Sequence, residues 1–181
     1  MPLLDYLRKK CLDKIGFSKE AYCLKCPGGH SWSDSGLLCT ARDLLVTAQL
    51  VMNGGQWAGE KLLNRQYIQE AISKRVDNNP LNLNEYNMQG YGYYFWRTFD
   101  NSYFFNGMGG QLAVCVPDKE IIFIYNSDNQ GNEYARKIII DNFFELIVRN
   151  AKKIEVHRNA EEREKLLAYI NISYMCRAGT D

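Results

Sequence analysis

The residues with the clearest chemical potential in this 181-residue chain form a glycine-rich run, Asn106-Gly107-Met108-Gly109-Gly110-Gln111. Glycine adopts positive φ without steric cost, and its missing side chain lets a ligand come close to the backbone. The run lies between Tyr103–Phe105 and Leu112–Val116, which are rich in aromatic and β-branched residues and therefore predict the strands of a β-hairpin. We expect this segment to contact a ligand. The alternative is that its glycines only form a bulge.

Three helices are predicted ahead of this run. Apolar residues recur at helical spacing in a segment that begins at Leu3, and Gly16 ends the pattern. Thr40 and Asp43 have the spacing of a capping box, with the carboxylate in the first helical turn, where the helix dipole favours a negative charge. Asn64 is placed to cap a third, shorter helix.

The second half of the chain predicts a sheet and a long helix. Tyr91–Trp96 is almost wholly aromatic, which is typical of a strand packed on both faces. With the hairpin it predicts an antiparallel sheet of about three strands between residues 91 and 126. The helix that follows has an apolar face made of Ile139, Ile140, Phe143, Phe144 and Ile147. We expect an α/β fold of the α+β type over residues 1–150, with a helical extension over residues 151–181.

Charge and hydropathy exclude several classes of protein. The 22 lysines and arginines nearly balance the 21 aspartates and glutamates, and no dense basic stripe is present, so neither nucleic acid nor an anionic membrane is expected as a partner. No apolar run approaches the ~20 residues of a membrane span, and the first residues lack the pattern of a signal peptide. A cytoplasmic location is therefore expected.

The cysteines agree with a reducing compartment. Six of them are scattered without the dense spacing of a disulfide scaffold. Cys23, Cys26 and His30 offer three zinc ligands, but a structural zinc site normally takes four. A redox Cys-x-x-Cys motif opens a helix after a strand, whereas this one precedes Pro27-Gly28-Gly29, which reads as a loop. Loop thiols without a function are favoured, and no metal or cofactor is expected.

Six segments, taken in order, resemble the C-terminal half of the serine β-lactamase-related hydrolases. That family groups class C β-lactamases, D-Ala-D-Ala carboxypeptidases, esterases and nylon-oligomer hydrolases. The similarity runs from about Leu3 to about Val148 and implies a partial β-lactamase-like fold that lacks its N-terminal half and the strands which that half adds to the sheet. The matching segments are Ser35–Leu44, Asn53–Trp57, Tyr91–Tyr93, Gly107–Gln111, Pro117-Asp118 and Asn126.

The resemblance implies hydrolysis through an acyl-serine. Family members use a Ser-x-x-Lys motif, a Tyr-x-Asn or Ser-x-Asn motif, and then a Lys-Thr-Gly or His/Gly-rich motif on a strand. No serine of this chain has a lysine three residues later, so no catalytic residue is assigned. Ser127-Asp128-Asn129 and Tyr169-Ile170-Asn171 spell the second motif but follow the third, and chance is the favoured explanation. Truncation would account for both missing motifs.

The resemblance also implies where a substrate would bind. Met108 takes the place of the cation in the third motif, which favours an uncharged ester, amide or peptide ligand. Amides near Gly110 and Gln111 would supply part of an oxyanion hole, and a side chain added at Gly110 is expected to obstruct the groove at little cost to the core. We expect Tyr91–Trp96 and the loop Ser31–Ser35 nearby. The substrate-binding residues assigned are Gly107, Met108, Gly109, Gly110 and Gln111.

Two functions remain open on the sequence alone. The chain is either a truncated serine hydrolase, active only if another chain supplies the missing motifs, or a non-catalytic binding or interaction domain on the same half-fold. A half-sheet exposes an unpaired apolar edge, which favours self-association. We therefore expect a homo-oligomer or a complex with a complementing N-terminal half.

Overall fold

The computed structural model describes residues 1–32, 35–79, 85–130, 132, 134–152, 161, 164, 165 and 168. The chain divides into two compact units, Met1–Ala151 and Lys152–Asp181. In the second unit Glu161, Glu164, Lys165 and Ala168 are helical, and most of the predicted extension lies outside the described residues. No helix in the described ranges combines the length and the apolar character needed to cross a membrane.

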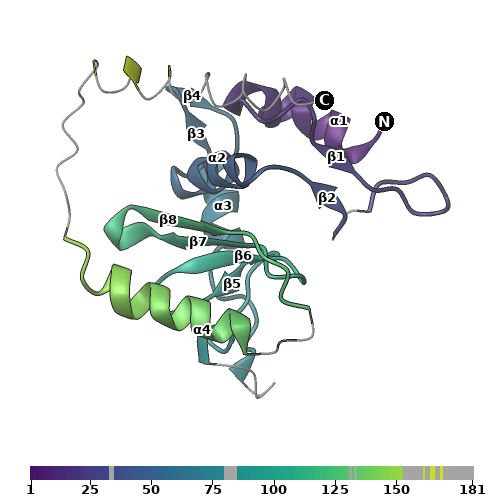
Figure 1. Ribbon diagram of the computed structural model, residues 1–181. Helices are drawn as coiled ribbons and strands as arrows, with labels where there is room; N and C mark the ends of the chain where they lie inside the picture. The colour runs from purple at the N-terminus through teal and green to yellow at the C-terminus, as the bar shows by residue number, and fades with distance from the viewer. Residues whose placement is uncertain are drawn as a thin grey trace. The chain divides into compact units, whose positions relative to one another are not determined.

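The first unit is built on a four-stranded antiparallel sheet with the strand order β5-β6-β7-β8 (Figure 1). The strands are Trp96–Arg97 (β5), Tyr103–Asn106 (β6), Leu112–Val116 (β7) and Ile121–Tyr125 (β8). Every residue of β7 is buried, whereas every residue of β8 is half-buried. The predicted mixture of helices with an antiparallel sheet is confirmed, with one strand more than expected.

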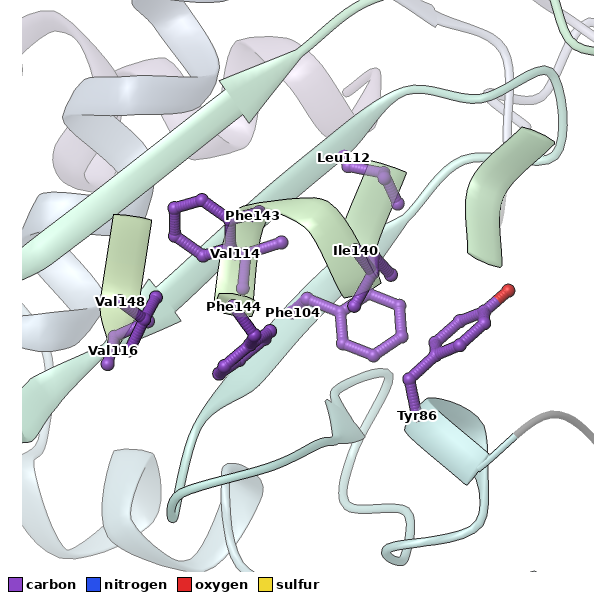
Figure 2. Close-up of a cluster of buried hydrophobic side chains, with 9 residues drawn as sticks. All are labelled: Tyr86, Phe104, Leu112, Val114, Val116, Ile140, Phe143, Phe144 and Val148. Atoms are coloured by element: carbon purple, nitrogen blue, oxygen red, sulfur yellow. The ribbon is translucent and has the colours of Figure 1, made fainter. Parts of the chain in front are cut away.

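Helices cover both faces of this sheet (Figure 1). On one face α2, Ala41–Met52, contacts β7 and β8. On the other face lie α4, Ala135–Asn142, and the π-helical segment Phe143–Val148 that continues it. Figure 2 shows the core on this second face, which consists of Tyr86, Phe104, Leu112, Val114, Val116, Ile140, Phe143, Phe144 and Val148.

The apolar face of the last helix differs from the prediction at one position. Ile147 is 49% exposed, and Val148 is buried in its place. The cause is the π-helical hydrogen bonding of this segment, in which the N–H of Arg149 donates to the carbonyl of Phe144 at 3.0 Å. A π-turn adds one residue to the helical repeat, so the buried face moves from residue 147 to residue 148.

The predicted strand over Tyr91–Trp96 is wrong except at its last residue, Trp96, which begins β5. The N–H of Gly92 donates to the carbonyl of Phe95 at 2.8 Å, and Tyr94 has a φ of 63°, so this segment is a tight turn. Gly92 packs so closely on the end of the helix before it that an added Cβ would lie 1.9 Å from the carbonyl oxygen of Ala71. A close approach to a neighbouring backbone therefore overrode the strand propensity of the aromatic residues.

The predicted helix ends are confirmed. The first helical segment comprises α1, Leu3–Leu7, and π and 3-10 turns that run to Ile15, and Gly16 ends it with a φ of 75°. Asn64 Oδ1 accepts two amides at the start of α3, Arg65–Ala71. Two short hairpins connect these helices, β1 with β2 and β3 with β4, over Tyr22–Cys23, Leu37–Leu38, Gln56–Trp57 and Glu60–Lys61.

Asp43 has a larger role than a helix cap. Its Oδ2 accepts the Thr40 N–H at 2.8 Å, while the Asp43 N–H donates to Thr40 Oγ1 at 3.1 Å, which completes the predicted capping box. Its Oδ1 accepts the N–H of Ser18 at 2.6 Å, and the residue is only 3% exposed. One buried carboxylate thus joins the start of α2 to the segment that follows Gly16.

Replacing Asp43 with alanine is expected to lower the free energy of unfolding by about 3 kcal/mol, because two amides lose a charged acceptor. Thr40→Ala is the matched control and should cost about 1 kcal/mol, since it removes only the hydroxyl of the cap. Urea unfolding followed by circular dichroism measures both losses. Equal losses would show that Asp43 acts only as a cap.

Candidate functional site

The glycine-rich run forms the turn between β6 and β7. The Gly107 N–H donates to the Gln111 carbonyl at 2.8 Å, and the Gly110 N–H donates to the Gly107 carbonyl at 3.2 Å. Met108 is 87% exposed at this turn, and Gln111 is exposed as well. Gly110 is buried and has a φ of 100°, in the left-handed region that favours glycine. The turn therefore presents two side chains to solvent and packs its last glycine inward.

The segment after β8 supports this turn. Ser127 Oγ donates to the Gly110 carbonyl at 3.1 Å, and the Asn129 N–H donates to the Gly109 carbonyl at 2.8 Å. Gln111 Nε2 in turn donates to the Ser127 carbonyl at 3.2 Å. The residues that spell Ser-x-Asn thus lie against the glycine turn and hold its carbonyls, a contact that their order in the sequence did not indicate.

Arg136 holds the same turn from the start of α4. Its Nη2 donates to the carbonyls of Gly107 at 2.9 Å and Met108 at 3.1 Å. Sequence reasoning missed this residue. Its position in the sequence could have indicated a role. A cation in the first turn of a helix interacts unfavourably with the helix dipole, so another interaction is expected to stabilise it there. Here the reason is the pair of backbone carbonyls that accept from it.

Three buried polar atoms near the turn have no hydrogen-bond partner among the described residues. They are Asn106 Oδ1, Asn129 Nδ2 and Arg136 Nε, on the residue before the turn and on two residues that contact it. A buried polar atom left unpaired costs on the order of 1–3 kcal/mol, and ordered water commonly satisfies such groups. The surroundings of the turn are therefore polar, in contrast to the apolar core beneath the sheet.

The two backbone amides assigned to an oxyanion hole differ in availability. The Gly110 N–H is already bonded to the Gly107 carbonyl, so it donates to a ligand only if that bond opens. No hydrogen bond of the Gln111 N–H is found within the described part of the chain. Of the two donors, the Gln111 N–H is therefore the one without a described bond, and the hairpin pairing directs it toward the β6 side of the turn.

The expected neighbours of the turn divide into two groups. Tyr91–Trp96 lies beside β6, because the Phe95 ring packs 5.0 Å from that of Phe105. The loop Ser31–Ser35 contacts the start of the first helix, where Ser31 Oγ accepts the N–H of Leu3 at 3.2 Å. Residues 33 and 34 lie outside the described residues. The structure brings together only the first of these segments with the strand that leads to the turn.

The pKa values of the buried Cys11 and Cys115 and of the half-buried Cys39 do not favour thiol chemistry. Burial and, secondly, the Asp43 carboxylate raise the pKa of Cys39 to about 11. Burial raises the pKa of Cys115 to about 12 and also raises that of Cys11. These thiols stay protonated at neutral pH and are poor nucleophiles. Among the described residues no group of three or more His, Cys, Asp or Glu side chains could hold a metal ion.

No protein-family model matches this sequence, and no curated protein matches it. Solved structures of other proteins share its fold, among them the following two. A candidate 6-aminohexanoate-dimer hydrolase from Bacillus anthracis aligns with a TM-score of 0.60 and 19% sequence identity, over 81% of this chain and 39% of that one. A candidate β-lactamase from Bacteroides dorei DSM 17855 aligns with a TM-score of 0.54 and 12% identity, over 76% of this chain and 50% of that one.

The chain has part of a β-lactamase-like fold. Both structures are serine β-lactamase-related, and this chain spans half or less of the length of each. The resemblance drawn from the sequence motifs and the partial fold that it implied are thus supported by independent structural likeness. The assignment of Gly107–Gln111 to substrate contact remains a prediction about this β-lactamase-like half-fold.

The expectation that residue 110 tolerates a side chain does not hold. A Cβ at Gly110 would lie 2.5 Å from Ser127 Oγ and 2.6 Å from Asn129 Nδ2, at a positive φ. Gly110→Ala is expected to cost about 2 kcal/mol or more, whereas Gly109→Ala should cost less than about 1 kcal/mol. The control is matched because the contact below 3 Å at Gly109 is with the end of the Gln111 side chain. Chemical denaturation compares them, and equal costs would mean that the turn is free to rearrange.

Replacing Arg136 with methionine is expected to loosen the turn while α4 stays folded. Loss of a charge-assisted bond to two carbonyls should speed hydrogen exchange of the Gly110 and Asn129 amides by about tenfold or more. Lys137→Met is the control, because Lys137 pairs with Asp141 at the surface of the same helix. Amide exchange measured by NMR reports both variants. Unchanged exchange in Arg136→Met would show that the β6–β7 hairpin alone fixes the turn.

Proposed function

We propose that this chain forms the substrate-binding half of a serine hydrolase that acts on an uncharged amide or ester, with the nucleophile supplied by sequence outside it. The observation that carries the proposal is the glycine turn at Gly107–Gln111, on a hairpin within a fold shared with a candidate 6-aminohexanoate-dimer hydrolase and a candidate β-lactamase. Both of those names describe enzymes that cleave amide bonds. The exposed Met108 at the turn offers no cation to a substrate carboxylate.

In this proposal the chain contributes binding and electrostatic stabilisation. The glycine turn lets the scissile carbonyl approach the backbone on its β6 side, toward which the Gln111 N–H points. That N–H donates to the oxygen that becomes negative as the serine attacks. The bonds from Ser127, Asn129 and Arg136 hold the turn in one shape, so the donor is oriented before substrate binds. Positioning of this kind is what a strand edge can supply without a nucleophile of its own.

The test is labelling with a fluorescent fluorophosphonate, which reacts with activated serines. The isolated chain should give no labelled band, because none of its serines has a lysine three residues later. A second chain that carries Ser-x-x-Lys and Tyr-x-Asn, taken from the front half of a hydrolase of this fold, should become labelled only when this chain is added. Stoichiometric labelling of a serine in this chain, located by peptide mass, would contradict the proposal.

A control variant separates the assigned site from general folding. Gly109→Ala keeps the turn but narrows the approach to it, so it should reduce labelling of the added chain while the two chains still bind each other. Ser127→Ala tests the only serine described against the turn. If Ser127→Ala abolished labelling of this chain in the absence of a partner, Ser127 would be the nucleophile and the proposal would be wrong.

A non-catalytic interaction domain is the second candidate, and one observation favours it. Several large apolar side chains are exposed around β1 and β2, including Tyr22, Trp32 and Leu38 at 52%, 51% and 53%. Exposed apolar side chains mark an interaction site where they form a contiguous patch. Two results together would favour the interaction domain over the hydrolase. No complementing chain would become labelled, and a protein would bind tightly through the surface around β1 and β2.

A further inference from the structure

The outer edge of β8 is open in the described part of the chain. β8 is the last strand in the order of the sheet, and its only described strand partner is β7. Its residues are Ile121, Ile122, Phe123, Ile124 and Tyr125, with no charge, glycine or proline among them. Natural edge strands are commonly blunted by lysine, proline or a bulge. None of these devices interrupts the five residues of β8.

The direction of its free hydrogen-bonding groups follows from the register. The Gly107 N–H donates to the Gln111 carbonyl, so Gln111, Ala113 and Cys115 bond toward β6, and the residues between them bond toward β8. Those residues pair with Ile121, Phe123 and Tyr125. The backbone N–H and carbonyl groups of Ile122 and Ile124 therefore point away from the sheet.

A groove lies beside this edge on the α2 face. This open groove has a volume of about 570 Å³ between α2 and the start of β8. Its lining is mixed, with Leu45, Met52, Pro117 and Ile122 beside the polar Gln49, Asn53 and Glu120. On the opposite face the Phe123 ring stacks 4.5 Å from that of Phe143. The edge is thus flanked by apolar surface on the α4 face and by mixed surface on the α2 face, where Ile122 and Ile124 are apolar. A segment that pairs with it is expected to be extended, uncharged and apolar on the side that meets the α4 face.

β8 itself is such a segment. Ile122 and Ile124 pack on the α2 face, while Ile121, Phe123 and Tyr125 pack on the α4 face. Because β8 carries no charge, two copies of the strand place no like charges opposite each other along its length. A two-fold axis lets the same groups serve as donors and acceptors in both copies.

We propose that two copies of this chain associate through their β8 strands, which pair antiparallel and join the two sheets into one. In this arrangement Phe123 lies opposite Phe123 of the second copy. The N–H and carbonyl of Ile122 bond to those of Ile124 in the other chain. The side chains of Ile122 and Ile124 of both copies then cover the groove beside α2. This interface does not rest on the proposed hydrolase function, but a front half that adds strands next to β8 would occupy the same edge, so the dimer is the state of this chain without such a partner.

The oligomeric state of the full chain tests the interface. Light scattering coupled to gel filtration should give a dimer at tens of micromolar. Ile124→Pro removes an outward-facing N–H and should give a monomer, since proline is tolerated in edge strands where its position faces away from the sheet. Ile124→Ala is the matched control, because it also trims the side chain but keeps the N–H, and it should remain a dimer. A monomeric wild-type chain, or an Ile124→Pro variant that folds and stays dimeric, would overturn the proposal.

Amide exchange of the wild-type chain gives a second readout that does not depend on any variant folding. The amides of Ile122 and Ile124 should become protected as protein concentration rises through the dimerisation range, with half-protection at the same concentration as half-association. The amides of Ile121 and Phe123 bond to β7 and should not respond. Protection of Ile122 and Ile124 that is independent of concentration would mean that a segment of the same chain covers the edge, and the proposed dimer would be wrong.

Discussion

The burial of β7 on both faces is the constraint on which the rest of the unit depends. Its five residues alternate between two cores, with Leu112, Val114 and Val116 under α4 and with Ala113 and Cys115 under α2. A strand in this position cannot shift by one residue without exchanging the contents of both cores. β7 therefore fixes the register of β6 and β8, and with them the position of the turn that precedes it.

The position of the glycine turn is set by β7, but the turn is stabilised by contacts from other segments. The hairpin sets where the turn begins and ends, while side chains from two other segments bond to its carbonyls. Those segments, the residues after β8 and the start of α4, are consecutive in the chain. The turn and the connection between sheet and helix are therefore parts of one arrangement, so a ligand that moves the turn must also strain that connection.

Sequence patterns predicted the local elements well where one interaction decides them. The capping box of Thr40 and Asp43 and the cap at Asn64 involve residues within three positions of each other, and both are present. The failures involve residues distant in the chain. Gly92 turns the aromatic run because the carbonyl of Ala71 leaves no room for a side chain, and no pattern within the run contains that information.

In the candidate site, too, local features could be predicted from the sequence and contacts between distant residues could not. The position of the glycine run on a hairpin followed from its flanking residues, and the family resemblance followed from the order of short motifs. The inward packing of Gly110 could not be predicted in this way. It depends on Ser127 and Asn129, which follow β8 in the chain and contact the turn only in the folded structure. Likewise Arg136 is 28 residues from Met108 in sequence, although the two share a hydrogen bond.

The π-helical segment Phe143–Val148 has a consequence for how this chain tolerates changes in length. A π-turn is an α-helix with one extra residue accommodated without breaking the helix. Here the extra residue turns Ile147 outward and Val148 inward. Loss of one residue from this segment would restore the ordinary helical repeat and return an aliphatic side chain to the same place in the core. We therefore expect this segment to tolerate a single-residue deletion, a change in length that proteins more commonly accommodate in loops.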